Sequence, residues 1–368
     1  MEARTDPAEH TSIASLLQAS YEELRACLLA YADLLPRSLI EIGKLALSAP
    51  GKLMGELPLE GGALPARMPR WPLFVLLSYQ AACEPYRRHT WREALPAAVA
   101  VEVAMAAADL LDELADGDPS PVAARYGEAQ AANTANLMLV MAQQILARHA
   151  LAHEGERRAR ALVALHTLQD TLVRAAIGQH LDMLYEKMGP HEVTLEMSAQ
   201  VTELKAGTLI AGAFRMGALM AGAEAPVVDL LTRAGKELGG IAQLINDVED
   251  VLPRTADRHG EDPEGNAEPR IQPKTDLQLR KRTLPIVFTL RDDSPQPNAL
   301  QTAYAQQEPC EQDEEALRQA VVIAGGVKFA ELIMNVHRQN AEQALSELEA
   351  LRPGAREILS PLLAALDQ

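Results

Sequence analysis

Long apolar runs with helical spacing dominate the chain, and this feature does most to limit the folds that it can adopt. From Leu73 onward the runs have the length and spacing of amphipathic helices. Convincing runs of Val, Ile, Thr or aromatic residues that alternate with polar residues, as strands require, do not occur. Aromatic residues make up only 4% of the chain, while good helix formers fill segment after segment. The sequence therefore predicts an all-α protein.

Two Gly- and Pro-rich segments separate the predicted helices. Residues 50–72 are expected to form a long connection, and residues 253–273, which hold four prolines, a mobile loop. Residues 1–12 are expected to be a flexible tail. Nothing divides residues 13–368 into two cores, so they are expected to form a single domain. Helices are predicted over Ile13–Leu35, Leu39–Leu47, Leu95–Leu114, Val122–Ala150, Glu156–Met188, Leu195–Ala221, Val227–Leu252, Leu284–Leu290, Glu314–Val322, Gly326–Leu351 and Ala355–Leu366.

Charge and cysteine content exclude several classes of protein. The chain has 34 Lys and Arg against 51 Asp and Glu, a net charge of −17, which argues against a nucleic-acid partner. Cys27, Cys83 and Cys310 are far apart and include no CxxC pair, so neither a zinc site nor a disulfide framework is indicated. The N-terminal residues are acidic and polar, unlike a signal peptide, and charge interrupts the apolar runs. We therefore expect a cytoplasmic protein with no membrane span.

A first carboxylate cluster ends a very apolar predicted helix. Asp109, Asp112, Glu113 and Asp116 are three or four residues apart and therefore share one face. Like charges repel one another, and negative charge is disfavoured at the C-terminal end of a helix. Mg²⁺, which selects carboxylate oxygens, would compensate them. The alternative interpretation is a solvated acidic helix end.

A second cluster consists of Gln243, Asn246, Asp247 and Asp250, again on one face of an otherwise apolar predicted helix. Buried carboxylates need counter-charge. Two such clusters on two helices can face each other across a cavity.

Lysines near these clusters offer the counter-charge. Lys205 lies within an apolar segment, and Lys274 and Lys281 flank a short polar one. Carboxylates, Mg²⁺ and lysines together would hold a diphosphate. A lysine considered alone is more commonly a surface residue whose stem covers apolar groups.

In this order, the motifs resemble those of the polyprenyl synthetase family of trans-isoprenoid diphosphate synthases, within the class I isoprenoid and terpene synthase fold. The resemblance runs from about Pro72 to the C-terminus and implies one large helical bundle around a central cavity. Its landmarks are Glu102, the DDxxD-like Asp112–Asp116, Tyr126–Ala129, the GQxxD-like Gly178–Asp182, the KT-like Lys205–Leu209, the aspartate-rich Gln243–Asp250 and the KxTLP segment within Asp276–Pro285.

The resemblance also implies cofactor, substrate and assembly. These are three Mg²⁺ ions, an allylic prenyl diphosphate and a homodimer, for which Leu95–Leu114 offers a face to pack against its copy. The implied metal ligands are Asp112, Glu113, Asp116, Asn246, Asp247 and Asp250; the implied diphosphate-binding residues are Lys205, Gln243, Lys274 and Lys281; the implied catalytic residues are Asp112, Asp116, Asp247 and Lys205; and the implied pocket residues are Met105, Ala107, Ala108 and Gln179.

The sequence departs from this family mainly at the isopentenyl diphosphate site. The family's basic GKRxRP segment is matched only by the surroundings of Arg67 and Arg70, its histidine position holds Met105, and its Arg-Arg-Gly is missing. Each lost charge-assisted contact typically costs ~1.5–3 kcal/mol, which Arg125 with the other two arginines would restore only in part. Glu113 and Asn246 also stand where the family has Asp.

These departures favour an enzyme that ionises one allylic diphosphate and releases diphosphate. The substrate is expected to have a C15 or C20 chain, with C20 preferred because Ala107 and Ala108 leave room. The cation would cyclise, lose a proton or meet water, as in a terpene synthase. The alternatives are a chain-elongating polyprenyl diphosphate synthase, a transferase to another acceptor, and a non-catalytic accessory subunit.

Overall fold

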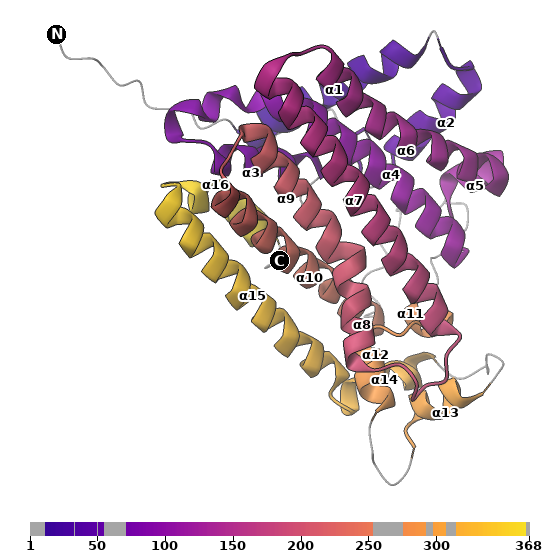
Figure 1. The fold of residues 1–368 in the computed structure, drawn as a ribbon. Coiled ribbons are helices and arrows are strands. Elements are labelled where there is room, and N and C mark those ends of the chain that lie inside the picture. Colours follow the sequence, from indigo (N-terminus) through magenta and orange to yellow (C-terminus); the bar gives the residue numbers. More distant parts are fainter. Residues whose placement is uncertain are drawn as a thin grey trace, which may run out of the picture.

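A computed structural model of the protein describes residues 12–32, 34–49, 51–54, 71–252, 275–291, 297–306 and 314–365. Within these ranges every regular element is a helix, which confirms the predicted fold class (Figure 1). The expected mobile loop at residues 253–273, Lys274, Arg67, Arg70 and almost all of the expected tail lie outside the described residues.

Long helices form the bundle, and α7, α9, α10 and α15 lie side by side along it (Figure 1). Shorter helices cap its ends. The long helices are α1 Ile13–Ala32, α3 Trp71–Ala82, α4 Leu95–Asp116, α6 Glu128–Leu151, α7 Gly155–Glu186, α9 Thr208–Ala221, α10 Ala225–Val251 and α15 Gly326–Leu351; the others are α2 Arg37–Leu47, η1 Pro85–Ala94, α5 Pro121–Tyr126, α8 Leu195–Thr202, η2 Glu203–Gly207, α11 Asp276–Leu279, α12 Leu284–Leu290, α13 Ala299–Ala305, α14 Glu314–Ile323 and α16 Ala355–Ala365.

Helix α4 forms the centre of the main core. Its alanines and valines are almost all buried because small side chains let neighbouring helices pack closely. Pro85–Asp116 is long and apolar enough to cross a membrane by composition, unlike our expectation, but 78% of its most apolar window is buried inside the fold. The same burial contradicts the expected use of Leu95–Leu114 as a dimer face, because that face already packs against its own chain.

A single π turn interrupts the predicted helix Leu195–Ala221. It is η2, which lies between α8 and α9. Two glycines explain how η2 fits: a Cβ on Gly178 of α7 would lie 2.9 Å from the backbone nitrogen of Lys205, and one on Gly239 of α10 would lie 2.5 Å from the carbonyl oxygen of Ala206. The turn is therefore clamped between the backbones of α7 and α10. Such π turns recur at functional sites.

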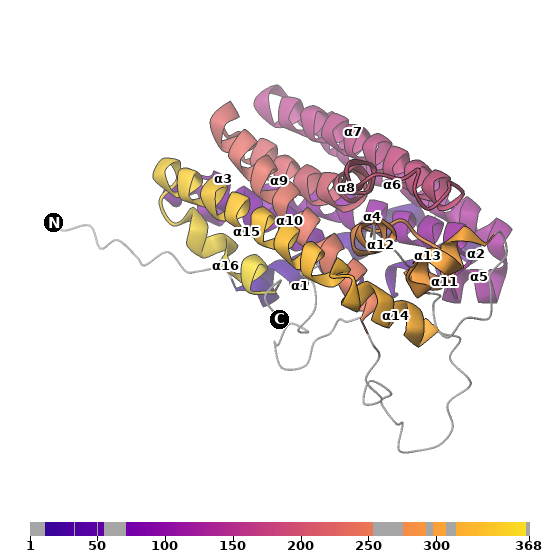
Figure 2. The ribbon, with the colours of Figure 1, turned by 90° about the horizontal axis from the view of Figure 1, so that it is seen from below.

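The C-terminal end of α10 meets a smaller hydrophobic core formed with α11 to α15 (Figure 2). Arg318 of α14 closes this end, because its guanidinium donates to the carbonyl oxygens of Asp250 and Leu252. Those carbonyls belong to the last turn of α10, which lacks intrahelical partners. This contact fixes the end of α10 that carries the second aspartate cluster.

Candidate active site

Two lysines from different parts of the chain converge on Asp182, near the C-terminal end of α7. The Nζ of Lys205, in η2, lies 2.9 Å from Asp182 Oδ2, and the Nζ of Lys281, just after α11, lies 3.2 Å from the same oxygen. Burial alone would raise the pKa of Asp182, but the two ammonium groups outweigh burial and lower it. Asp182 is therefore ionised at neutral pH and anchors both lysines.

The same lysines reach the first aspartate cluster on α4. Lys205 Nζ lies 3.5 Å from Asp112 Oδ1, and Lys281 Nζ lies 2.9 Å from Asp116 Oδ1. Lys281 also lies 2.7 Å from Glu186 Oε1, one turn beyond Asp182 on α7. Burial favours the neutral amine, but the surrounding carboxylates raise the pKa of both lysines. The carboxylates of α4 and α7 thus share the two positive charges of Lys205 and Lys281.

The second aspartate cluster is more deeply buried. Asp247 is 2% exposed and accepts a hydrogen bond of 2.8 Å from the Gln243 side-chain amide. Burial raises the pKa of Asp247 to about 7. The backbone N–H of Asp276 donates to Asp250 Oδ2 over 2.7 Å, and burial together with Asp247 and Asp250 raises the pKa of Asp276. Asn246 is exposed.

The remaining predicted site residues occupy different surroundings. Glu113 forms a hydrogen bond with the Ser120 side chain at the start of α5, so it lies beside α5 and not beside Lys205 and Lys281. Burial outweighs this hydrogen bond and raises the pKa of Glu113. Met105 and Ala107 are buried in the main core, whereas Ala108 is half-buried. Both polar atoms of the Gln179 side-chain amide are buried with no hydrogen-bond partner among the described residues.

Lys52 is a candidate that the sequence analysis did not identify. Its side chain is 4% exposed and forms an ion pair with Asp109, one turn before Asp112 on α4. The backbone N–H of Leu53 donates to Glu102 Oε1 over 2.5 Å, which fixes this segment on α4. In the sequence, only the Gly51-Lys52 pair in a Gly- and Pro-rich segment points to this residue. The resemblance assigns the family's basic segment to Arg67 and Arg70 instead.

The donor set fits Mg²⁺ only with help from a substrate. Among the described residues no three His, Cys, Asp or Glu side chains are grouped so that they could hold a metal by themselves. Mg²⁺ usually keeps several waters and takes one or two protein carboxylates together with substrate phosphates. Asp112 and Asp116 on α4 and Asp247 on α10 offer such oxygens, and the orphaned Gln179 amide indicates that a polar ligand completes the site.

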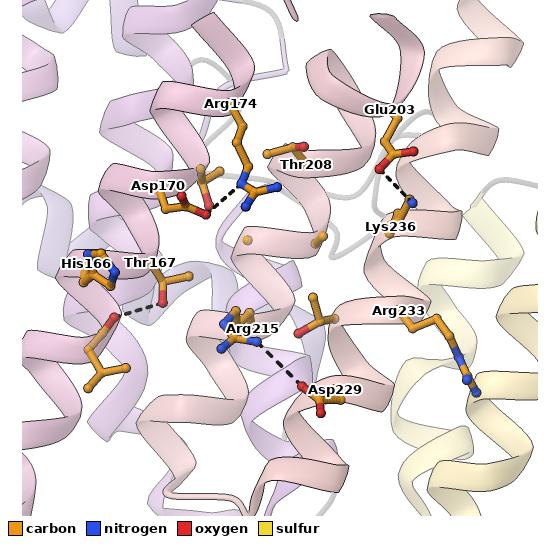
Figure 3. A pocket seen from close by; sticks show the side chains of 15 residues that line it. His166, Thr167, Asp170, Arg174, Glu203, Thr208, Arg215, Asp229, Arg233 and Lys236 are labelled. Atoms are coloured by element: carbon orange, nitrogen blue, oxygen red, sulfur yellow. Dashed lines mark hydrogen bonds and ion pairs between the residues drawn. The ribbon is translucent and has the colours of Figure 1, made fainter. Parts of the chain in front are cut away.

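A separate cavity of about 560 Å³ lies between α7, α9 and α10 (Figure 3). None of the predicted site residues line it. Glu203 of η2 does, and its carboxylate lies 2.8 Å from Lys236 Nζ on α10. This ion pair therefore ties η2 to α10 in the turn that also carries Lys205.

Comparisons with known proteins give a consistent result. The profile of the Polyprenyl synthetase family matches residues 70–322. The (2E,6E)-farnesyl diphosphate synthase of Mycobacterium tuberculosis is 29% identical over 225 residues, which are 60% of this chain and 55% of that protein. The chain's match thus spans little more than half the length of that relative.

Solved structures extend the similarity of fold to nearly the whole chain. A polyprenyl synthetase from Streptomyces coelicolor has a TM-score of 0.69 at 22% identity, covering 95% of this chain and 96% of that chain. A geranylgeranyl pyrophosphate synthase from Corynebacterium glutamicum, in complex with isoprenyl diphosphate and magnesium, has a TM-score of 0.67 at 18% identity, covering 95% and 96%. At these identities the likeness shows a shared fold.

Proposed function

Because the chain belongs to the polyprenyl synthetase family, we propose that it is a Mg²⁺-dependent prenyltransferase that joins an allylic prenyl diphosphate to isopentenyl diphosphate. The departures from the family's motifs in the sequence favour a terpene-forming enzyme, with chain elongation as the alternative. The names of the relatives, all of them prenyl diphosphate or polyprenyl synthases, support the alternative. Lys52 supports it as well, since it is a cation beside the first aspartate cluster that the sequence analysis had not counted.

The observation that carries the proposal is the convergence of Lys205 and Lys281 on Asp182, beside Asp112 and Asp116. Each ammonium group has three hydrogen-bond donors. A diphosphate oxygen accepts a stronger hydrogen bond from them than a carboxylate that binds Mg²⁺ instead. A bound diphosphate would therefore take donors from the lysines and release the two α4 carboxylates for Mg²⁺.

The proposed reaction begins with heterolysis of the allylic C–O bond. Bound Mg²⁺ supplies charge neutralisation at the leaving diphosphate. Lys205 and Lys281 donate hydrogen bonds to the diphosphate oxygens as the electron pair moves onto them. The double bond of isopentenyl diphosphate adds to the allylic cation, and a proton lost from the adduct passes to the released diphosphate. Apolar α4 residues such as Met105 exclude water, which would otherwise capture the cation.

Lys52 is proposed to bind the diphosphate of the second substrate. Its charge is offset at present by Asp109, whose side chain is 54% exposed and free to turn towards water. The Leu53–Glu102 hydrogen bond holds the lysine in place. A buried cation held by a backbone contact is preorganised, so little side-chain entropy is lost when an anion binds.

Terpene formation from one substrate remains the second candidate, because Met105 is apolar and buried where the family has a histidine. Product analysis separates the two. Purified protein is incubated with Mg²⁺ and geranyl, farnesyl or geranylgeranyl diphosphate, with and without isopentenyl diphosphate, and products are identified by mass spectrometry. Longer diphosphates that form only with isopentenyl diphosphate are the expected result. A terpene or terpene alcohol from an allylic substrate alone would overturn elongation, and silence in every reaction would indicate an accessory subunit.

Matched variants connect the result to the site. Asp112→Asn and Asp247→Asn keep side-chain shape but remove charge, so we expect turnover to fall to background while circular dichroism spectra stay unchanged. Asp170→Asn is the control, because Asp170 forms an exposed ion pair with Arg174 and belongs to neither carboxylate cluster. Full activity in both site variants would refute the proposed roles of the clusters.

We also propose that the protein forms a homodimer through α7 and α6, since α4 is buried within its own chain. Leu162, Val173, Ile177 and Leu184 of α7 are 45–60% exposed, and Val140 of α6 is 52% exposed. Aliphatic side chains in a row on one helix face are costly in water and indicate a covered surface. Light scattering should give about twice the chain mass, and Ile177→Glu should give monomers. A monomer in the wild-type protein would contradict this assembly.

A further inference from the structure

A second cavity, of about 250 Å³, lies where η1, α9, the end of α6 and the start of α7 meet. It is far from the carboxylate site: 25 residues of α7 separate Arg157 from Asp182 (182 − 157), which is about 38 Å along a helix. One small ligand cannot contact both. The cavity, here called the arginine cleft, is lined by Arg92, Glu93, His149, His153, Arg157, Arg160 and Met220.

Two of the three guanidinium groups of the arginine cleft form ion pairs with nearby carboxylates. Arg160 donates to Glu156 over 2.8 Å, and its guanidinium lies so close to Gly222 that a Cβ there would fall 2.4 Å from Cζ. Gly222 has φ +70° at the end of α9, a conformation that favours glycine. Arg157 donates to Glu93 over 2.9 Å. These contacts direct both guanidinium groups toward the cleft, where an anion could replace the carboxylate partners.

Arg92 and two histidines complete the wall of the cleft. The Arg92 guanidinium lies 4.4 Å from the centre of the Trp91 ring, a cation–π contact. The rings of His149 and His153 lie 4.4 Å apart, and His153 Nδ1 lies 2.8 Å from the His149 carbonyl oxygen. Burial, with help from the neighbouring His153 and Arg157, lowers the pKa of His149.

The cleft is electropositive in a protein whose net charge is −17. Three guanidinium groups face one lining carboxylate, Glu93, and one neighbouring carboxylate, Glu156. The N-terminal N–H groups of α7, a helix of 32 residues, add positive potential at the same end. Arginine forks match the oxygens of phosphate groups and bind them in bidentate fashion.

We propose that the arginine cleft binds a phosphate-type anion, as inorganic diphosphate in solution or as the headgroup of an anionic phospholipid. The site is independent of the proposed reaction and uses none of its residues. Three arginines supply permanent charge, and the two histidines add charge when they are protonated. Protonation of these imidazoles strengthens binding, because an anion favours the charged rings. The charged groups that face these histidines are Arg92, Glu93, Arg157 and Arg160.

The histidine rings report binding locally. Ring C–H signals of His149 and His153 are followed by NMR, with assignment from His149→Gln, while inorganic diphosphate is added without Mg²⁺. We expect saturable shifts in both signals and an upward shift of the His149 pKa when the anion is bound. Arg157→Gln and Arg160→Gln should each weaken binding about tenfold or more. Because Arg157 is 60% exposed, its variant is expected to fold even where the Arg160 variant does not.

The control is Arg174→Gln, which removes an arginine from the same helix and from the same kind of i,i+4 ion pair, with Asp170 at 2.8 Å. It should bind like the wild-type protein. A parallel experiment measures cosedimentation of the protein with phosphatidylglycerol vesicles. The lipid is the source of the anion if Arg157→Gln abolishes vesicle binding and free diphosphate does not shift the histidine signals. The proposal is wrong if neither probe responds, or if Arg174→Gln weakens binding as much as the cleft variants do.

Discussion

The ammonium group of Lys281 lies 2.9 Å from the carboxylate of Asp116, although 165 residues separate the two along the chain. The contact joins the segment after α11 to the end of α4. Asp182 of α7 lies 3.2 Å from the same ammonium group, so α7 is joined to α4 and to the segment after α11. The charges that sequence analysis assigned to separate motifs therefore form one network, and its members should respond to substitution as a unit.

Lys205→Met tests this network most directly. The ammonium group of Lys205 is proposed to hold the leaving diphosphate, so its loss should lower kcat about 100-fold or more. Asp182 would keep Lys281 as a partner, so thermal unfolding should change little. Diphosphate release measured under saturating substrate gives the rate. Lys187→Met, at the end of α7 and outside the network, should retain wild-type kcat, and equal losses in both variants would contradict the assigned role.

Lys52→Met separates the two substrates. If Lys52 binds the diphosphate of isopentenyl diphosphate, its loss should raise the KM for that substrate about tenfold or more and leave the KM for the allylic substrate nearly unchanged. Initial rates with each substrate varied in turn provide both constants. Lys44→Met, which removes an exposed lysine of α2 that pairs with Glu41, is the control. Equal effects on both KM values would mean that Lys52 has only a structural role.

Gly178→Ala should disturb η2 and with it Lys205. The added Cβ would lie 2.8 Å from Leu204 Cβ and 2.9 Å from the Lys205 nitrogen, so the turn must move. We expect a loss of about 1–3 kcal/mol in unfolding free energy and a clear loss of activity. Gly43→Ala, in α2, has no atom within 4 Å of the new Cβ and should stabilise the helix by about 0.5–1 kcal/mol. Denaturant unfolding of both variants checks the contrast, which fails if both are stabilised.

The Glu237–His337 pair between α10 and α15 should make stability depend on pH. Burial would raise the pKa of Glu237, but the hydrogen bond from His337, over 2.6 Å, outweighs burial and lowers it. Because the carboxylate has a lower pKa in the folded state, its contribution is full above about pH 4.5 and disappears as the pH falls through the folded-state pKa. Glu237→Gln should therefore lower stability by about 1–2 kcal/mol at pH 7, and less at pH 4.

The neighbouring Arg233–Glu347 pair joins the same two helices and is exposed, so Glu347→Gln is the matched control. Exposed pairs contribute little, and this variant should unfold like the wild-type protein at both pH values. A destabilisation by Glu237→Gln that stays constant from pH 7 to pH 4 would show that charge is not its cause.

The sequence was sufficient to predict the fold class and most long helices. Predicted and observed bounds of α7, Glu156–Met188 and Gly155–Glu186, differ by at most two residues, because apolar spacing persists along the whole helix. The elements η1, α11 and α13 were not predicted: α11 and α13 are too short to show a period, and η1 is mostly polar and shows no apolar spacing. The π turn η2 was missed for a related reason: one inserted residue per turn leaves the surrounding helical pattern intact.

The site was predicted in part. Lys205 was identified from its unusual apolar surroundings and Lys281 as nearby counter-charge in a polar segment, and both lie in the charged network. Asp182 appeared only as part of a family motif, because its importance depends on partners 23 and 99 residues away. Lys52 was missed because local sequence gives no sign of which segment of a Gly- and Pro-rich connection folds back onto α4. Long-range pairing of this kind is decided by packing, which no local pattern records.

The clamped glycines have a consequence for anyone who diversifies this protein. At Gly178 and Gly239, and likewise at Gly217 of α9, whose added Cβ would lie 2.2 Å from the carbonyl oxygen of Val75 on α3, one methyl group would collide with the backbone of a neighbouring element, so these positions offer no useful variation in a combinatorial library. Ala108 is half-buried on α4, so we expect it to accept a larger set of side chains. Randomising such positions while holding the three glycines fixed would concentrate sampling on variants that still fold, and would make each screened clone more informative.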